Sequence, residues 1–483
     1  MRLRARWRWV VAGAATAALV VPVGWSWQAS LLPDEYDMAA MGYADWGGGP
    51  VGEPGAHGAH GPSGVPVAEL TETAAGPADV RETFTVQTAS AGRFTVNGQT
   101  PGPLLEARVG DLVEVTLVND DVEEGVTLHW HGVGVPNAAD GVAGVTQDAV
   151  LPGQSHVYRF VADQAGSFWY HSHQLSHEQV RRGLLGPLVV HEERPDPAVV
   201  DQVALLHAYG DGPTLNGEPG VSELDVAPGQ RVRLRVVNTD NGLATVWVTG
   251  AAFEVTAVDA TDVNDPSPVE DRAVRVPAGG RVDLGLEVPA GGVRVDFGGT
   301  TSLVLGRDPT GGAATLPPTE VVDLLTYGRP TDLGLDPTDP DRVFDYRIGK
   351  RPGFLDGRPG MWWSINGHLF PDVAMFMVEE GDVVVVRIEN GSDDAHPMHL
   401  HGHHAVVLSR DGVPATGSPW WVDSLEVGTG ETFEIAFVAD NPGLWMDHCH
   451  NLPHAAQGLV SHLMYAGVVS SYRVGGGPGN QPE

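Results

Sequence analysis

The sequence contains almost no cysteine and almost no lysine. Cys449 is the only cysteine and Lys350 the only lysine among 483 residues. One cysteine excludes an intramolecular disulfide framework, and a lone thiol in an oxidising compartment is a liability unless something occupies it. Basic residues are also scarce: 28 Lys and Arg stand against 62 Asp and Glu, which gives a net charge of −34. Such a surface disfavours nucleic acid as a partner, because nucleic-acid binding needs clustered basic side chains.

Glycine and proline are abundant, with 63 and 37 residues, and short Val-rich runs recur along the chain. This composition favours β-sandwiches over helical bundles. The length suggests about three domains of roughly 150 residues each. We therefore expect an all-β protein with several tandem domains.

The two ends of the chain differ from the body in composition. Residues 1–32 begin with four spaced arginines and continue with an apolar stretch, which is typical of an export signal or a membrane anchor. We expect an uncleaved anchor with the basic end in the cytoplasm; secretion is the alternative, and either places the body outside the cytoplasm. Residues 33–76 are rich in glycine and acidic side chains and are interpreted as a flexible linker, and residues 473–483 as a flexible tail.

The body repeats one pattern three times, at residues 107–119, 226–238 and 378–390. Each copy is a turn followed by an alternating strand, and an Asn-Gly pair precedes each copy. Such a repeat indicates three copies of one structural unit. We place the domains at residues 77–196, 197–330 and 331–472. The middle unit carries none of the His-x-His motifs described below, so we expect it to be a structural spacer.

Histidines gather in four short clusters. These are His129-Trp-His131, His171-Ser-His173, His396-Pro-Met-His399-Leu-His401, and His448-Cys449-His450 followed by His454. On a strand, neighbouring side chains point to opposite faces. Cys449 would therefore face one way and His448 and His450 the other. If both faces bind metal, two sites lie back to back along one strand.

The donor set decides between metals. Structural zinc sites usually show paired cysteines at short spacing, and this chain has none. One thiolate with two histidines is the blue-copper set, which His396, Cys449 and His454 can supply. The eight other cluster histidines are too many for one mononuclear site.

With these motifs in this order, residues 80–470 resemble the three-domain, laccase-like multicopper oxidases, and we expect a bacterial one. The resemblance implies three tandem cupredoxin-like Greek-key β-sandwiches and four copper ions. It implies a type 1 copper held by His396, Cys449 and His454, and a type 2 copper held by His129 and His399. The type 3 pair would be held by the remaining six histidines, which are His131, His171, His173, His401, His448 and His450.

Two positions depart from the resemblance. Relatives often carry a methionine five residues after the last type 1 histidine, where this chain has Leu459. A non-coordinating axial residue would leave three-coordinate copper with a raised potential. Some bacterial relatives also place a carboxylate directly after that histidine, where this chain has Ala455. Asp140 matches the other acidic position near the cluster in these relatives, so we take it as the candidate proton donor; an ordinary Asp-Gly turn is the alternative.

The resemblance implies an oxidase that takes single electrons from a reducing substrate through Cys449, His448 and His450 and reduces dioxygen to water. We favour phenols or aromatic amines as substrates, with cuprous ion or manganese as the alternative. A copper nitrite reductase lacks histidines on both sides of the cysteine, and an electron carrier would leave eight histidines idle. We expect a monomer whose only membrane contact is the N-terminal segment.

Overall fold

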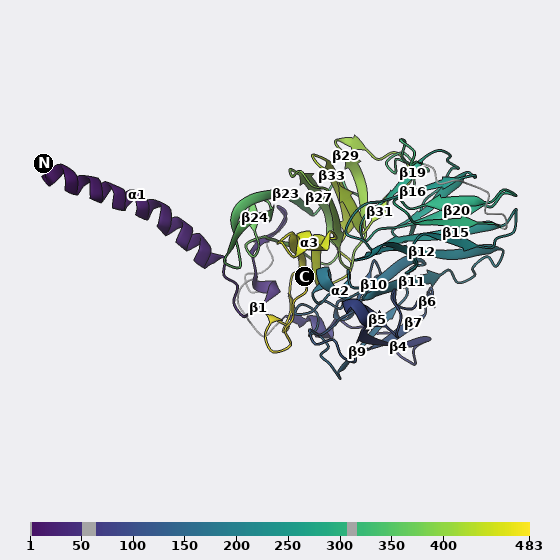
Figure 1. The fold of residues 1–483 in the computed structure, drawn as a ribbon, viewed down its shortest axis with the longest axis horizontal. Helices are drawn as coiled ribbons and strands as arrows, with labels where there is room; N and C mark the ends of the chain where they lie inside the picture. Colours follow the sequence, from purple (N-terminus) through teal and green to yellow (C-terminus); the bar gives the residue numbers. More distant parts are fainter. Residues whose placement is uncertain (1, 51–63, 307–315) are drawn as a thin grey trace.

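The computed structural model describes residues 2–50, 64–306 and 316–483, and the parts of the predicted linker and second domain at 51–63 and 307–315 lie outside them. The body consists of three β-sandwiches that follow one another along the chain, while helix α1 (Arg2–Ala29) projects away from it (Figure 1). Within these residues, no helix has both the length and the apolar character that crossing a bilayer requires. The all-β prediction is confirmed.

The first sandwich packs two four-stranded sheets, ordered β5-β4-β7-β9 and β6-β11-β10-β8. Its strands are β4 (Val80–Thr88), β5 (Phe94–Val96), β6 (Leu105–Arg108), β7 (Leu112–Asn119), β8 (His129–His131), β9 (Ser155–Val161), β10 (Gly166–His171) and β11 (Leu185–His191). Alternation in β7 buries Val113, Val115 and Leu117 against the facing sheet. A short helix, α2 (Ser176–Gln179), joins β10 to β11.

The second sandwich packs a six-stranded sheet, β13-β12-β15-β20-β17-β18, on a five-stranded one, β14-β22-β21-β16-β19. The strands are β12 (Val199–Tyr209), β13 (Gly212–Leu215), β14 (Val221–Leu224), β15 (Arg231–Asn238), β16 (Ala244–Thr249), β17 (Phe253–Val258), β18 (Thr261–Asp262), β19 (Ala273–Val276), β20 (Arg281–Glu287), β21 (Val293–Asp296) and β22 (Ser302–Leu305). Its interior is a separate cluster of mostly aliphatic side chains with a few aromatic ones.

The third sandwich packs the sheet β2-β26-β35-β34-β28-β32, in which β2 is Tyr43–Asp45, on the sheet β25-β24-β23-β27-β33-β29-β30, with β31 paired to β29. Its elements are β23 (Arg342–Leu355), β24 (Arg358–Ile365), β25 (His368–Leu369), β26 (Ala374–Val378), β27 (Val383–Asn390), β28 (His396–Leu400), β29 (Ala405–Arg410), β30 (Val413–Pro414), β31 (Trp421–Val422), β32 (Ser424–Val427), β33 (Thr432–Val438), β34 (Leu444–Cys449), α3 (Leu452–Ala455) and β35 (Val460–Tyr465).

The sequence repeat is a structural repeat. The asparagine of each Asn-Gly pair has a positive φ, 52° at Asn97, 51° at Asn216 and 52° at Asn366, as a tight hairpin turn requires. The last residue of each repeat, Asn119, Asn238 or Asn390, is also buried and donates its amide to two backbone carbonyls, one in the loop that follows it and one in a segment distant in sequence. The equivalent asparagine thus makes the same kind of link in each sandwich.

The described parts of residues 33–76 and the tail 473–483, which the sequence analysis interprets as a flexible linker and a flexible tail, form short strand pairs. Strand β1 (Glu35–Tyr36) pairs with β37 (Val474–Gly475), β2 (Tyr43–Asp45) with β26, and β3 (Val65–Pro66) with β36 (Val468–Val469). Met38 and Val67 are buried in the core of the third sandwich. Strands of two or three residues carry no readable periodicity, so composition alone suggested a linker.

Candidate metal centres

The first candidate centre, which we call the cysteine site, lies inside the third sandwich. It consists of Cys449 at the end of β34, His396 at the start of β28 and His454 in α3. The thiol Sγ lies 3.7 Å from Nδ1 of His396 and 3.8 Å from Nδ1 of His454, and the two nitrogens are 3.3 Å apart. A triangle of this size matches one metal ion with bonds of about 2 Å to each donor.

The cysteine lies in the apolar core of the third sandwich. Cys449 is fully buried, and that burial raises the pKa of its thiol well above the usual range. An unliganded thiol there would therefore stay protonated, whereas a bound metal would hold it as thiolate. Burial also lowers the pKa of both histidines, that of His396 to about 4. Both imidazoles are consequently neutral and ready to coordinate at neutral pH.

The second candidate centre, the histidine cluster, lies between the first and third sandwiches. Strands β8 and β10 of the first sandwich and β28 and β34 of the third, with the residues just beyond three of them, supply its eight buried members: His129, His131, His171, His173, His399, His401, His448 and His450. Nε2 of His448 lies 3.4 Å from Nε2 of His173 and 3.2 Å from Nε2 of His401. The structure thus brings eight sequence-predicted histidines together.

Several of these imidazoles are oriented by a backbone carbonyl oxygen next to Nδ1. The Nδ1 atoms of His129, His171, His173 and His399 lie 2.8–3.0 Å from the backbone carbonyl oxygens of Asp140, Ser172, Pro482 and Asp423. Six of the eight rings leave a buried nitrogen with no hydrogen-bond partner in the part of the chain that the structure describes; these are His129, His131, His171, His399, His448 and His450. Buried polar atoms are rarely left unpaired, and imidazoles anchored on one side and free on the other are typical of metal ligands.

The charge state of the histidine cluster fits metal binding. Burial, followed by repulsion from neighbouring imidazoles, lowers the pKa of most of these rings well below the usual range; for His448 the pKa falls to about 3. Neutral imidazoles are the form that binds metal.

Strand β34 joins the two centres. Sγ of Cys449 points toward His396 and His454, whereas the ring of His448 lies among His173 and His401 on the other side. Alternation along one strand therefore places a thiol in one centre and the adjacent imidazole in the other.

Comparison with known proteins decides the family. Two multicopper oxidase models match residues 80–195 and 337–466, which together make up more than half of the chain. The chain belongs to the multicopper oxidases.

Among the relatives of this multicopper oxidase is MmcO of Mycobacterium tuberculosis, 26% identical over 77% of this chain and 83% of its own length. Laccase-1 of Botryotinia fuckeliana is 28% identical over 78% of this chain and 79% of its own. The crystal structure of a multicopper oxidase from Pseudomonas thermotolerans superposes with a TM-score of 0.64 at 29% identity, covering 80% of this chain and all of that one. These likenesses confirm the cupredoxin fold and the laccase-like character; the relatives are fungal and bacterial, so a bacterial origin stays a prediction.

Asp140 lies against the histidine cluster. Its carboxylate Oδ1 is 3.1 Å from Nδ1 of His129 and 3.1 Å from Nδ1 of His401. Asp140 is fully buried, and that burial is the main cause that raises the pKa of the carboxyl. The side chain is thus placed to hold two imidazoles without occupying their free nitrogens.

The sequence analysis missed a second supporting carboxylate. Asp423 Oδ1 lies 3.2 Å from Nε2 of His131, and its carbonyl oxygen 2.8 Å from Nδ1 of His399. The guanidinium of Arg281, on β20, donates two bonds of 2.6 Å to this carboxylate. Burial alone would raise the pKa of Asp423, but the Arg281 charge and the His131 hydrogen bond outweigh it and hold that pKa well below its usual range.

The second sandwich is therefore more than a spacer, although we find no cluster histidine in its described residues. Besides Arg281, it supplies Gly279, whose φ is +80°. A Cβ atom at Gly279 would lie 2.9 Å from Cε1 of His131 and 3.0 Å from Cδ2 of His450. Only glycine allows the backbone to pass so close to these rings. No short motif marks Arg281 or Gly279, so their sequence gives no sign of this role.

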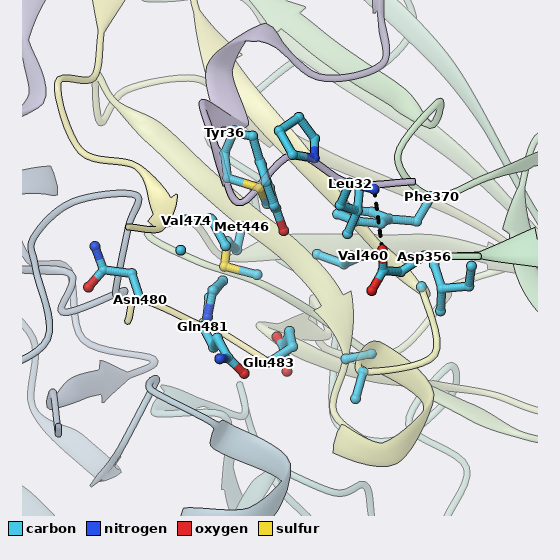
Figure 2. Close-up of a pocket in the computed structure, with 18 of the residues that line it drawn as sticks. Leu32, Tyr36, Asp356, Phe370, Met446, Val460, Val474, Asn480, Gln481 and Glu483 are labelled. Atoms are coloured by element: carbon cyan, nitrogen blue, oxygen red, sulfur yellow. Dashed lines mark hydrogen bonds between the residues drawn. The ribbon is translucent and has the colours of Figure 1, made fainter. Parts of the chain in front are cut away.

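The carboxyl-terminal residues also reach the histidine cluster. Oε1 of Glu483 lies 3.2 Å from Nδ1 of His448, and burial raises the pKa of this carboxyl to about 8. Glu483 lines a cavity of about 470 Å³, and Figure 2 shows Leu32 and Phe370 on one side of it and Gln481 and Glu483 on the other. The cavity thus lies between the two terminal segments and borders the cluster.

The two departures from the family pattern lie near the cysteine site. Leu459 is fully buried, and its carbonyl oxygen accepts a hydrogen bond of 3.1 Å from the backbone N–H of Cys449. Ala455 is buried in α3, next to His454, and lines the same cavity as Glu483.

Proposed function

We propose that this multicopper oxidase holds four copper ions in the two centres and oxidises phenols or aromatic amines. The observation that carries the proposal is the run His448-Cys449-His450, whose thiol completes a three-donor site while the histidine before it joins a cluster of eight imidazoles. Bound copper would supply the one-electron oxidation of substrate and the four-electron reduction of dioxygen to water.

The ligand assignment follows the two centres. His396, Cys449 and His454 would hold the type 1 copper, and His129 and His399 the type 2 copper. The type 3 pair would be held by the other six rings of the cluster: His131, His171, His173, His401, His448 and His450. The neutral state of most cluster imidazoles and their unpaired nitrogens support this assignment.

The protein's own contribution is position, environment and protons. Cys449 and His448 are adjacent in the chain, so electrons would need to cross only a few covalent bonds between the centres. We assign proton delivery to Asp140, because its buried carboxyl contacts two rings of the cluster. Leu459 is the residue we propose at the axial position of the type 1 copper. Its alkyl side chain offers no donor atom, and its carbonyl oxygen accepts a hydrogen bond from the backbone N–H of Cys449.

The substrate class and the location are further parts of the proposal. Similarity to laccases supports phenols as the proposed substrate class, whereas similarity to an iron transport multicopper oxidase keeps a metal ion as the alternative. The arginines and apolar residues of the N-terminal segment support export, with the body outside the cytoplasm, either anchored or secreted.

The test is metal analysis combined with dioxygen uptake. Copper-loaded protein should hold four coppers per chain, show an intense blue thiolate absorption, and consume dioxygen with phenols or aromatic amines. Cys449→Ser should lose the blue colour and keep much of the copper in the histidine cluster. Stoichiometric zinc in protein produced with ample copper would contradict the proposal. If dioxygen uptake occurs only with cuprous or manganous ion, the substrate is a metal ion and not a phenol or an aromatic amine.

A further inference from the structure

The only lysine of the chain lies next to the cysteine site. Lys350 on β23 is the cross-strand partner of Trp363 on β24. Its ammonium Nζ lies 3.8 Å from the centroid of the indole ring, a cation–π contact, and 2.8 Å from Oδ2 of Asp394. One ammonium group is thus held in place by an aromatic face and a carboxylate.

The same indole touches both histidines of the cysteine site. Trp363 is only 1% exposed, and its ring centroid lies 4.6 Å from that of His396 and 4.5 Å from that of His454. The ammonium therefore lies no more than roughly 8.5 Å from the centroid of either imidazole. That distance is comparable to the Debye length of about 8 Å at physiological ionic strength, so salt screens the charge only in part.

Asp394 is close to the cysteine site because it is close to His396 in the sequence. It lies in the turn before β28, two residues ahead of His396. Ser392 fixes this turn, because its hydroxyl donates to the carbonyl of Asp394 at 3.1 Å and lies 2.9 Å from Nε2 of His396. The structure therefore holds one positive and one negative charge beside the same pair of imidazoles.

We propose that Lys350 and Asp394 tune the reduction potential of the cysteine site in opposite directions. The inference rests on the proposed binding of a type 1 copper there. One electron entering the site converts Cu(II) to Cu(I) and lowers its positive charge by one unit. The ammonium favours the reduced state and raises the potential, whereas the carboxylate favours the oxidised state and lowers it. Trp363 acts as the spacer that fixes the distance of the ammonium.

Solvent reaches both charges, which limits the size of the effect. Because both side chains are partly exposed, 38% for Lys350 and 48% for Asp394, each charge should change the Cu(II)/Cu(I) equilibrium constant by only about threefold.

The experiment is a redox titration of the copper-loaded protein, followed by the blue absorption, for wild type, Lys350→Gln, Asp394→Asn and the double variant. Lys350→Gln should lower the potential, Asp394→Asn should raise it, and the double variant should return close to wild type. Lys350→Arg keeps the charge and should restore the wild-type potential. Potentials that move in the same direction, or not at all, would overturn the inference, because a purely packing role predicts no opposite signs.

Amine chemistry gives a second measurement that needs no mutation. Acetylation removes the charge of Lys350, whereas reductive methylation keeps it. Only the acetylated wild type should show a lowered potential, and acetylated Lys350→Arg, in which only the α-amine reacts, should not. A wild type that shows no blue absorption when loaded with copper would refute the proposed function itself. A blue wild type with unchanged potentials would refute only the role of the charge pair.

Discussion

Arg281 and Asp423 form a two-bond ion pair between the second and third sandwiches, with both hydrogen bonds at 2.6 Å. Both side chains are almost fully buried. Asp423 also contacts His131 and, through its carbonyl, His399. The pair therefore couples the packing of the second sandwich to two imidazoles of the histidine cluster.

Removing the cation of this pair should be costly. In Arg281→Gln the carboxylate of Asp423 stays buried without its main partner, and breaking a buried pair in this way costs about 3–5 kcal/mol. Urea unfolding of the copper-free variant should show this loss, and copper-loaded protein should hold less copper in the histidine cluster. Arg347→Gln removes an exposed pair with Asp345 and is the matched control, with a loss of no more than about 1 kcal/mol. Equal stability of the two variants would contradict the coupling.

A methionine at the proposed axial position should change the cysteine site. Leu459→Met introduces a thioether where the alkyl side chain offers no donor, and a thioether ligand stabilises oxidised copper. The potential of the blue copper should fall, and oxidation of poorly reducing phenols should slow. Redox titration and the absorption spectrum check this. An unchanged potential and spectrum would mean that residue 459 is not axial.

Loss of the Asp140 carboxyl should affect the dioxygen half of the reaction. General acid help is typically worth about 10²–10⁴ in rate, so Asp140→Asn should reoxidise that much more slowly in dioxygen after reduction by substrate. Copper content, blue colour and the reduction step should stay normal, which stopped-flow absorption can follow separately. Wild-type reoxidation in a fully loaded variant would leave Asp140 with a turn-forming role only.

Glu426 should make the folded state less stable as the pH rises from 4.5 to about 7, an effect that opposes the gain from the buried histidines. Burial, followed by the nearby Glu431, raises the pKa of Glu426 from 4.5 to about 7. A raised pKa in the folded state gives stability that is fully present below 4.5 and lost as the pH passes 7, because the unfolded chain releases this proton first. The contribution is about 3 kcal/mol.

Urea unfolding of copper-free wild type and Glu426→Gln at pH 5 and pH 8 isolates this loss, because the histidines contribute equally to both proteins. Between the two pH values the stability of wild type should change less favourably than that of Glu426→Gln by about 3 kcal/mol, whereas Glu82→Gln, at an exposed position, should follow wild type. A wild-type slope in Glu426→Gln would show that other groups carry the pH dependence.

Local sequence patterns were sufficient to predict the turns, the alternating strands and the histidine pairs. The Asn-Gly turn at Asn97 and the alternation around Val115 appear in the structure as expected. The four histidine clusters converge because each His-x-His pair is local to one strand or its end, while the shared fold brings the strands together.

The rest could not be read from the chain because it depends on contacts between distant residues. Arg281 and Asp423 are 142 residues apart in the sequence, and Glu483 lies 35 residues beyond His448. Neither side chain belongs to a motif, so only the folded structure identifies it. The same holds for Met38, one apolar residue in a glycine-rich segment that nevertheless fills the core.

The pairing of β2 with β26 has a consequence for biosynthesis. Tyr43–Asp45 leave the ribosome early, but their partner strand, Ala374–Val378, is made roughly 330 residues later, on the order of tens of seconds at typical elongation rates. During that interval the amino-terminal strand has no partner, and the first two sandwiches have time to fold before the third begins. The histidine cluster needs β28 and β34 as well, so its eight imidazoles can come together only after residue 450 has been made.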